Sequence, residues 1–582
     1  MRRVFGEITM KVLTKNFLIG ISLAVLFSFV CVSLPQVDSA EADVYFYFKH
    51  LPTLIYYAVL ILSITTAFVS KSVYLRAFSI FIFAFLIVSP PDVMLANSWL
   101  TDTYPFASEA VYVVRNGRIG EFHYLSENPS LGLFLGSFLM ATGIDAFLLM
   151  KIYQTLIVSI LVAIMCLMSK YLGINGGESY LMPMFFLAIM WPNVFHLSRQ
   201  SFGLIFYFSS WLFLVELVLH RYDRRIFLLL STQIFLMVVS HPATPIYFVA
   251  NVMMIAIVGS VFKVFKRKDM KTFVYGAAFC TAFWFLWNSV TDLNNIQIFR
   301  NIFVKLYNSL MEEPQHVSGV SRIFSGYTTT YSLLIDVRLV LTIAVFACSI
   351  FLPLIVYVHC RNPNTRKILV ILAGWNLSNL LSAVPLLYAG LPYFDRPVLF
   401  SFISWAPIGE LLYQVLKRSS PAYSKLRKVA KMVFVIFLIV VPSMLIPIIK
   451  YSPLPFLHPP TRELSAIFFA DVYSREKYTL LEFTAPWGYS YIRGLGVENI
   501  TGRYVLSGYE FSDGKLNFSR INSQAIVLTY RLICRDAFMD YNPSMLQVVK
   551  NITDSNAFQE KIYDSGWPYW MITFTSRQAG SR

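Results

Sequence analysis

Apolar runs bounded by short polar segments recur along most of this 582-residue chain, from Asn16 to about Tyr451. A helix of about 20 apolar residues crosses the hydrocarbon core of a membrane, so each run predicts a transmembrane span. The first run, Phe17–Leu34, lacks a small-residue cleavage pattern and is interpreted as a signal anchor. The predicted spans are 16–35, 51–70, 77–95, 151–168, 181–195, 202–219, 226–239, 245–262, 272–290, 333–357, 368–391, 397–416 and 432–449.

The basic residues set the expected orientation of these thirteen spans. Lys and Arg collect in cytoplasmic loops of membrane proteins, so the basic N-terminus and four basic loops are expected inside. For all these basic loops to lie inside, the short apolar stretch Leu131–Gly143 must not cross the membrane, so it is expected to be interfacial or re-entrant. Thirteen crossings then put the C-terminus outside. The basic loops are Arg221–Arg225, Lys263–Lys271, Arg361–Lys367 and Lys417–Lys431.

The pattern changes after the last span, where charged residues, turn residues and short β-rich runs replace the apolar runs. Strands are expected near 477–484, 503–509, 525–531 and 570–575, and helices near 461–472 and 543–550. The predicted fold class is therefore an α-helical polytopic membrane protein with a small C-terminal α/β extracytoplasmic domain. Residues 1–451 form the transmembrane domain, with a first large outer loop at 96–149, and residues 452–582 form the soluble domain.

Composition agrees with a membrane protein and excludes an ordinary soluble chain. Hydrophobic residues make up 57% of the sequence and charged residues 14%, against roughly 25% charged in soluble proteins. The net charge of +16 is explained by the cytoplasmic loops, so no nucleic-acid partner is expected. The six cysteines show no disulfide or metal-ligand spacing, and no nucleotide-binding or zinc-protease motif occurs.

Charged and polar side chains beside the spans are the candidates for chemistry, because they are costly in a membrane. Most of them fall on the predicted outer side, and Glu216 is the rare charge within a span, near its inner end. Acidic, basic and cationic side chains from segments far apart in sequence are thus expected to converge at the outer face of the membrane. These groups are Asp102, Glu109, His123 and Glu127 in the first outer loop, followed by His196, Arg199, Gln200, His241, Asp395 and Arg396.

Three segments carry a resemblance to a known family. They are Thr101–Tyr104 with the aromatic stretch Tyr112–Gly117 and Tyr124–Leu131, the Pro192–Gln200 segment, and Phe394–Arg396. Together with the architecture of the whole chain, they resemble the GT-C superfamily of membrane glycosyltransferases. The resemblance implies a sugar transferase that uses a polyprenyl- or dolichyl-phosphate-linked donor, mannosyltransferase-like, with membrane lipids and a glycan, protein or lipid acceptor as its partners.

The chemistry of that transfer assigns expected roles. Asp102 is the expected base, since a base must stand near the acceptor. Glu109, seven residues on and so two helical turns along the same face, is the second expected catalytic residue and would support the acceptor or a metal. Arg199, His241 and Arg396 are expected at the donor phosphate, because arginine binds phosphate bidentately. Acceptor and loop contacts are expected from Tyr104, His123, Tyr124 and Glu127. Asp102 lacks the adjacent second acid that is common in the family, so the cofactor is unknown and a divalent metal ion stays open.

Structural alternatives exist for each residue. Asp102 also suits the cap of a helix that begins near Pro105, and Glu109 suits a solvated helix face. His241, before Pro242, also suits the end of a span, and the two arginines suit interfacial snorkelling. The aromatic residues around His123 and Tyr124 also suit an interfacial belt.

Two other functions remain open at this point. A transporter or flippase of lipid-linked sugars is expected to show paired repeats and ionisable groups at mid-span, and no clear repeat is seen. A polysaccharide polymerase or ligase is expected to carry its arginines in a late outer loop. The loop from Asp292 to Asp336 keeps that alternative open through Arg300, Lys305, His316 and Arg322. The expected location is the plasma membrane, as a multi-pass protein with the C-terminal domain outside.

Overall fold

The structure is a computed structural model of the chain. It describes residues 2–34, 52–70, 72–94, 103–119, 127–172, 181–190, 195–220, 223–291, 294–311, 330–360, 362–388, 395–418 and 436–445, together with seven strands after residue 477.

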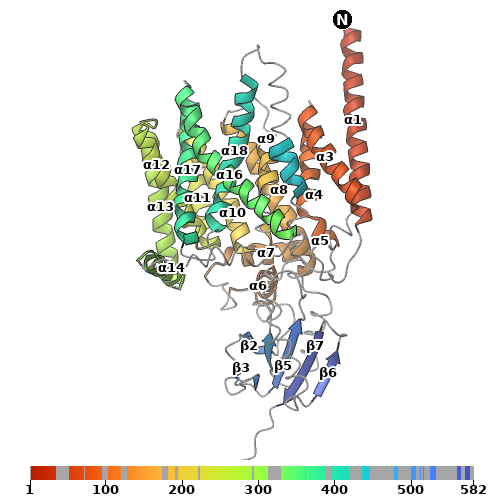
Figure 1. Cartoon of the computed structure of the whole chain (residues 1–582), viewed down its shortest axis with the longest axis vertical. Helices are drawn as coiled ribbons and strands as arrows, with labels where there is room; N and C mark the ends of the chain where they lie inside the picture. The colour runs from red at the N-terminus through yellow and green to blue at the C-terminus, as the bar shows by residue number, and fades with distance from the viewer. Residues whose placement is uncertain are drawn as a thin grey trace, which may run out of the picture.

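Helices dominate the described part of the chain (Figure 1). In order they are α1 (Arg2–Ser33), α3 (Thr53–Val69), α4 (Val73–Val88), α5 (Pro90–Met94), α6 (Thr103–Asn116), α7 (Ser130–Thr142), α8 (Ala146–Leu172), α9 (Leu181–Ile189), α10 (Arg199–Leu219), α11 (Arg224–Ser240), α12 (Thr244–Val261), α13 (Arg267–Thr291), α14 (Asn294–Met311), α16 (Thr330–His359), α17 (Pro363–Tyr388) and α18 (Asp395–Arg418), with a short π-helix η3 (Ile436–Val440).

Side-chain caps fix where several of these helices begin and end. Ser198 caps α10 by accepting a hydrogen bond from the Ser201 N–H, and Asp223 caps α11 by accepting one from the Arg225 N–H at 2.8 Å. Such caps satisfy N–H groups that have no partner within the helix. At the other end, α7 stops at Gly143, whose φ of 67° lies in the left-handed region that glycine adopts without strain.

Six helices of the described residues are long and apolar enough to cross a membrane. They lie within α1, α8, α10, α12, α13 and α17, and shorter apolar helices accompany them at α3, α4, α7 and within α16. The chain is therefore a helical membrane protein. Thirteen spans remain a prediction, because several of the expected ones are short or lie partly outside the described residues.

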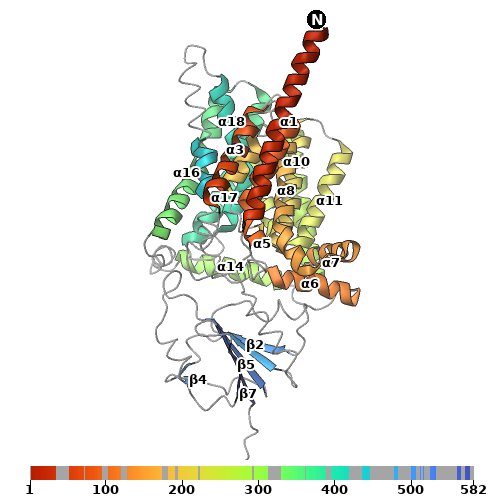
Figure 2. The same cartoon turned by 90° about the vertical axis from the view of Figure 1, so that its right-hand side faces the viewer.

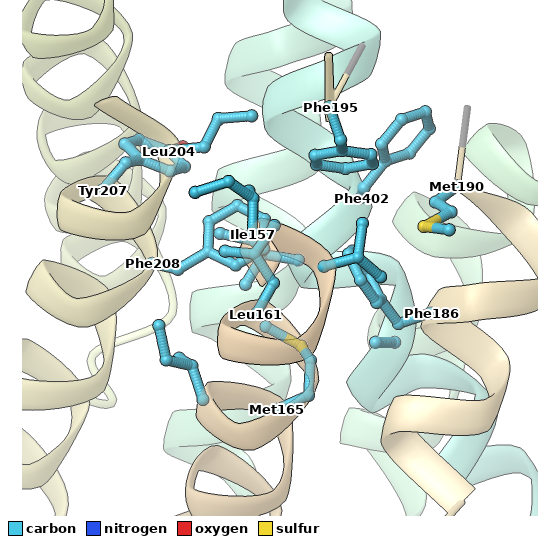
Figure 3. Close-up of a cluster of buried hydrophobic side chains, with 14 of the residues drawn as sticks. Ile157, Leu161, Met165, Phe186, Met190, Phe195, Leu204, Tyr207, Phe208 and Phe402 are labelled. Carbon is cyan, nitrogen blue, oxygen red and sulfur yellow. The ribbon is translucent and has the colours of Figure 1, made fainter. Parts of the chain in front are cut away.

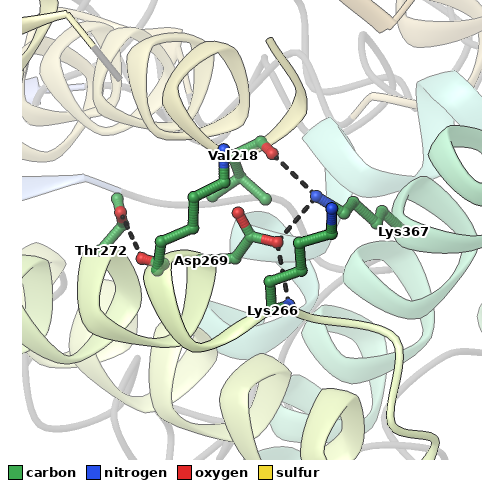
Figure 4. A network of polar contacts seen from close by, with 6 residues as sticks. Val218, Lys266, Asp269, Thr272 and Lys367 are labelled. Carbon is green, nitrogen blue, oxygen red and sulfur yellow. Dashed lines mark hydrogen bonds and ion pairs between the residues drawn. The ribbon is translucent and has the colours of Figure 1, made fainter. Parts of the chain in front are cut away.

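Polar contacts identify the two ends of the helix bundle. At one end, the Lys367 ammonium of α17 donates to Asp269 Oδ2 of α13 at 2.7 Å and to the Val218 carbonyl of α10 at 3.2 Å (Figure 4). Asp269 also accepts from the Lys266 N–H and so caps α13. The predicted inner loops Lys263–Lys271 and Arg361–Lys367 thus meet at this end, which is called the Lys367 end below.

The opposite end, called the Arg199 end, is where α10, α12 and α18 begin and α11 ends. Three helices lie across this end rather than along the bundle, namely α6, α7 and α14 (Figures 1 and 2). The helix α7 covers the stretch that was expected to be interfacial or re-entrant. The strands lie beyond the same end, away from the labelled N-terminus (Figure 1).

The core between the long helices is apolar and rich in aromatic rings. Side chains from α8, α9, α10 and α18 interdigitate in it, including Leu161, Phe186, Phe208 and Phe402 (Figure 3). Packing of this kind sets the distances between helices and holds their ends in register. Buried polar side chains are bonded across helices: Tyr207 OH accepts from Asn251 Nδ2 at 2.7 Å and from Trp375 Nε1 at 3.1 Å.

The C-terminal strands form one five-stranded sheet in the order β2-β1-β5-β7-β6 and a two-stranded ribbon of β3 and β4. They are β1 (Tyr478–Glu482), β2 (Ile500–Val505), β3 (Phe511–Ser512), β4 (Lys515–Leu516), β5 (Ala525–Arg531), β6 (Glu560–Asp564) and β7 (Trp570–Ser576). β1 pairs in parallel with β2 and β5, whereas β7 pairs antiparallel with β5 and β6. The predicted helices near 461–472 and 543–550 lie outside the described residues.

Three details differ from the sequence expectations. The helix expected near Pro105 begins at Thr103, and α8 begins at Ala146, so the first outer loop ends a few residues before 149. Glu216 is not the only acid within a predicted span, because Glu410 lies fully buried in α18 and accepts from Ser169 Oγ of α8 at 2.7 Å. The acid is visible in the sequence of the predicted span 397–416, whereas its hydroxyl partner, 241 residues away, could not be predicted.

Candidate functional site

A buried ion pair joins the helix α6 to the start of α10. Arg199 Nη2 donates to Glu109 Oε1, and the guanidinium also lies over the Phe106 ring, 5.5 Å from its centroid. Both charged residues are buried, with Glu109 0% and Arg199 6% exposed. A buried ion pair of this kind holds its two elements together firmly, because separating the charges leaves each of them uncompensated.

The turn that leads into α10 places Arg199 at the first helical position. Ser201 Oγ donates to carbonyls of this turn, with the His196 oxygen at 2.6 Å and the Ser198 oxygen at 2.8 Å. The Tyr153 hydroxyl of α8 lies 3.2 Å from the same Ser201 Oγ. The turn that carries Arg199 is therefore held in place by hydrogen bonds within the turn and by a contact with the neighbouring helix α8.

His241 lies in the turn between α11 and α12, beyond the last residue of α11. Its Nδ1 accepts a hydrogen bond from the Thr244 N–H at 3.3 Å and lies 2.8 Å from the Thr244 hydroxyl. A ring nitrogen that accepts carries no proton, so the neutral ring is protonated at Nε2. Removal from water, and then the positive charges of Arg396 and Arg199, lower the pKa of His241 to about 3.

Gly203 allows this turn to approach α10. A Cβ at this position would lie 3.1 Å from His241 Cβ and 3.3 Å from Thr244 Oγ1, closer than ordinary van der Waals contact. Gly203 lies one turn of α10 after Arg199, so the absence of a side chain lets the turn that carries His241 pack closely against the beginning of α10.

Two indoles of α13 hold the surrounding backbone. Trp284 Nε1 donates to the Pro242 carbonyl at 2.8 Å, and Trp287 Nε1 donates to the Glu127 carbonyl at 2.9 Å. Ser130 at the start of α7 adds a third tie, because its hydroxyl donates to Ser240 Oγ at 2.7 Å. The end of α11, the start of α7 and the end of α13 are thus linked at the Arg199 end.

The structure brings together four of the residues that were singled out in the sequence. Glu109 contacts Arg199, and Arg199 and Arg396 are the charges that act on His241. Tyr104 is fully buried, with its ring edge-on to Phe147 at 6.3 Å, and therefore packs in the core. Glu127 contributes its carbonyl to the Trp287 bond. Asp102, His123 and Tyr124 lie outside the described residues.

The burial values decide three of the alternatives. Glu109 does not lie on a solvated helix face, and Arg199 is not an interfacial snorkelling residue, because both are buried in one ion pair. His241 does end α11, as the structural alternative expected, and the positive charges of Arg396 and Arg199 act on it as well. The described residues contain no group of three or more His, Cys, Asp or Glu side chains placed to hold a metal ion.

Other residues at this end were not singled out in the sequence. Thr244 fixes the His241 ring, and the segment Ser240–Pro245 was noted only for its histidine and prolines. Asp92 is buried in α5 at the end of a predicted span and interacts electrostatically with Lys151 of α8. An acid directly after two prolines at the end of an apolar run is the signal that could have identified it.

The arrangement is suited to binding an anion. The guanidinium groups of Arg199 and Arg396 act electrostatically on the neutral imidazole of His241, while Glu109 compensates the positive charge of Arg199. Guanidinium and N–H donors of this kind bind phosphate and carboxylate oxygens through charge-assisted hydrogen bonds. Among known proteins, no family model and no curated sequence matches this chain.

Proposed function

We propose that this protein is a GT-C-type membrane glycosyltransferase that transfers a sugar from a polyprenyl- or dolichyl-phosphate-linked donor to an acceptor on the outer face of the membrane. One observation carries the proposal, namely the convergence of Arg199, His241 and Arg396 at one end of a membrane-embedded bundle. A phosphate that is attached to a membrane-embedded lipid meets the protein at such an end.

The roles of the residues follow from the chemistry. An oxygen of the acceptor hydroxyl attacks the anomeric carbon of the sugar, and the bond from that carbon to the phosphate oxygen breaks. The electron pair of that bond leaves with the lipid phosphate, whose growing negative charge Arg199 and Arg396 stabilise. His241, neutral and protonated at Nε2, donates a hydrogen bond to a phosphate oxygen. The proton of the acceptor hydroxyl goes to the Asp102 carboxylate.

The proposed architecture completes this picture. The Arg199 end faces outward in a thirteen-span chain, and the C-terminal α/β domain lies on the same side, at the plasma membrane. Its support is the sequence distribution of Lys and Arg, which concentrates at the Lys367 end, as expected for a cytoplasmic face.

The phosphate role of Arg396 is tested by Arg396→Gln, with Arg225→Gln as the matched control. Arg225 is an exposed arginine at the start of α11, at the other end of the bundle. Purified protein in vesicles is assayed for transfer from a panel of polyprenyl-phosphate sugars. A hydrogen bond to a charged group is worth about 1.5–3 kcal/mol, so transfer at low donor concentration should fall roughly tenfold or more in Arg396→Gln only. Equal transfer by both variants would contradict the proposed role of Arg396 at the donor phosphate.

The base is tested by Asp102→Asn in the same assay. Asparagine caps a helix nearly as well as aspartate, so the fold is retained while the proton acceptor is lost. General-base catalysis contributes on the order of a hundredfold to ten-thousandfold, and transfer should fall by at least about a hundredfold. Near-normal transfer by the folded variant would show that Asp102 is only a cap.

A further inference from the structure

The helix α14 carries apolar side chains on more of its surface than the bundle covers. Ile296 and Phe299 pack against the core, and the Phe299 ring lies edge-on to Trp284 of α13, with 5.7 Å between the ring centroids. Three further apolar side chains of the helix are exposed. Phe303 is 64% exposed, Tyr307 61% and Val304 47%.

The exposed apolar residues share one side of the helix, and polar residues occupy another. Phe303 and Tyr307 are four residues apart, so they lie one above the other, with Val304 beside them. Asn301 and Asn308 are seven residues apart, share a different face and are also exposed. Ile296 and Phe299 lie on the same face as Phe303, so the bundle covers the start of the apolar face and leaves its later part exposed. A helix divided in this way suits a boundary between an apolar and an aqueous phase.

The position of α14 places that boundary at the membrane surface. The helix lies across the Arg199 end of the bundle, at a steep angle to the long helices (Figure 2). It follows α13 after two residues, and the last turns of that candidate span expose Phe285, Leu286 and Val290. These three side chains are suited to face lipid, so the exposed side of α14 continues a lipid-facing surface.

The charges of the helix identify the occupant. Within 294–311 the sequence has Arg300 and Lys305 and no acidic residue, and Arg300 is exposed one turn from Phe303. A cation beside a half-buried apolar face, as Arg300 is here, suits the phosphates at the headgroup level.

We propose that α14 is a membrane-surface helix that buries Phe303, Val304 and Tyr307 among the acyl chains at the headgroup boundary of the leaflet at the Arg199 end. The partner is the phospholipid of that leaflet. This inference rests on the membrane-embedded fold and is independent of the proposed glycosyltransferase function.

The test uses the unaltered full chain in vesicles that contain a phosphatidylcholine with a diazirine on its acyl chain. After illumination, the cross-linked residues are located by mass spectrometry of peptides. Phe303 and Tyr307 should carry lipid about as often as Phe285 of α13, whereas Asn301 and Asn308 should carry little or none. Phe285 serves as the internal standard, because it lies on a candidate span.

Two results would overturn the proposal. Labelling of Phe285 without labelling of α14 would mean that water, the C-terminal domain or a second copy of the chain covers the helix. Equal labelling of the apolar and the asparagine faces would mean that α14 is surrounded by lipid rather than placed at its surface. The variant pair Phe303→Ser and Asn301→Ser provides an independent check, because only the first should lower lipid labelling of the neighbouring Tyr307 peptide.

Discussion

Glu109 and Arg199 form a buried ion pair. The attraction between the carboxylate and the guanidinium offsets the free-energy cost of removing each charge from water. This arrangement limits what Glu109 does in the proposed reaction. Its charge holds the arginine in place, so in this proposal Glu109 acts as a positioning residue for Arg199 rather than as a support for the acceptor or a metal. The guanidinium has five N–H donors, and one carboxylate oxygen does not use all of them. The same side chain can therefore also donate to a phosphate oxygen.

Paired substitutions separate the structural and chemical roles of Arg199. Glu109→Gln leaves a buried guanidinium uncompensated and should lower the free energy of unfolding by about 3–5 kcal/mol. The double variant Glu109→Met, Arg199→Met removes both charges with little change in volume and should recover most of that stability. Thermal unfolding in detergent measures both changes in stability, and the transfer assay measures the chemical role of Arg199.

Transfer should stay low in the double variant, because the phosphate loses its guanidinium even though the fold is restored. Recovery of both stability and transfer would assign Arg199 a purely structural role. The pair Asp269 and Lys367 provides the matched control at the opposite end of the bundle. Replacing Lys367 with methionine should lower stability without changing the dependence of transfer on donor concentration.

Individual residues differ in how far the sequence predicts them. Arg199, His241 and Arg396 were placed on one face from the order of spans and the sign of neighbouring loops, and they do lie at one end. The bond between Glu109 and Arg199 was not predictable, since it joins residues 90 positions apart through helix packing. The lowered pKa of His241 was equally hidden, because it depends first on burial of the ring and then on the positive charges of Arg396 and Arg199, which are distant in sequence.

At the scale of elements, short helices across the end of a bundle are the least predictable feature. The stretch that forms α7 has 13 residues, too few to cross a membrane without thinning it, and this length gave the expectation that it does not span. The orientation of α14 across the end of the bundle was not expected. The spacing of its apolar residues also fits a short helix in a loop that packs along the bundle. An amphipathic pattern predicts a helix with an apolar and a polar face. The orientation of that helix depends on whether each face contacts protein, lipid or water.

A reporter fused after Gly143 tests the position of α7. With α7 lying on the surface, the reporter should behave as external, for example as an active periplasmic or extracellular enzyme. A matched fusion after Ser70, in the short connection between α3 and α4, should behave as cytoplasmic. A cytoplasmic signal from the Gly143 fusion would make α7 a true span and would reverse the orientation of every later helix.

At the scale of the whole molecule, the strands and the candidate site lie toward the same end of the bundle (Figure 1). The sequence predicted the boundary between the two regions from composition, because charged and turn residues replace the apolar runs. It did not predict the strand order, in which β5 stands between β1 and β7, since pairing of distant strands leaves no local signal.

Cysteine labelling at Ser512 tests the orientation of the whole chain. Ser512 belongs to β3, in the short ribbon beside the main sheet. A thiol reagent that cannot cross membranes should modify Ser512→Cys in intact cells, whereas a cysteine at Arg225 should react only after permeabilisation. The opposite pattern would place the candidate site in the cytoplasm and exclude an extracytoplasmic acceptor.

The ion pair between Lys367 and Asp269 has a consequence for the biogenesis of the protein. Its partners are 98 residues apart, so α13 leaves the ribosome well before α17 provides the ammonium group. Until then, the Asp269 carboxylate and the Val218 carbonyl must be hydrated or held by an insertion factor. Both partners of the Glu109–Arg199 pair precede α17 in the chain, so that pair can form earlier in synthesis, whereas Asp269 waits for α17. Nascent chains that stall before Pro363 should therefore be preferred substrates for membrane quality-control proteases.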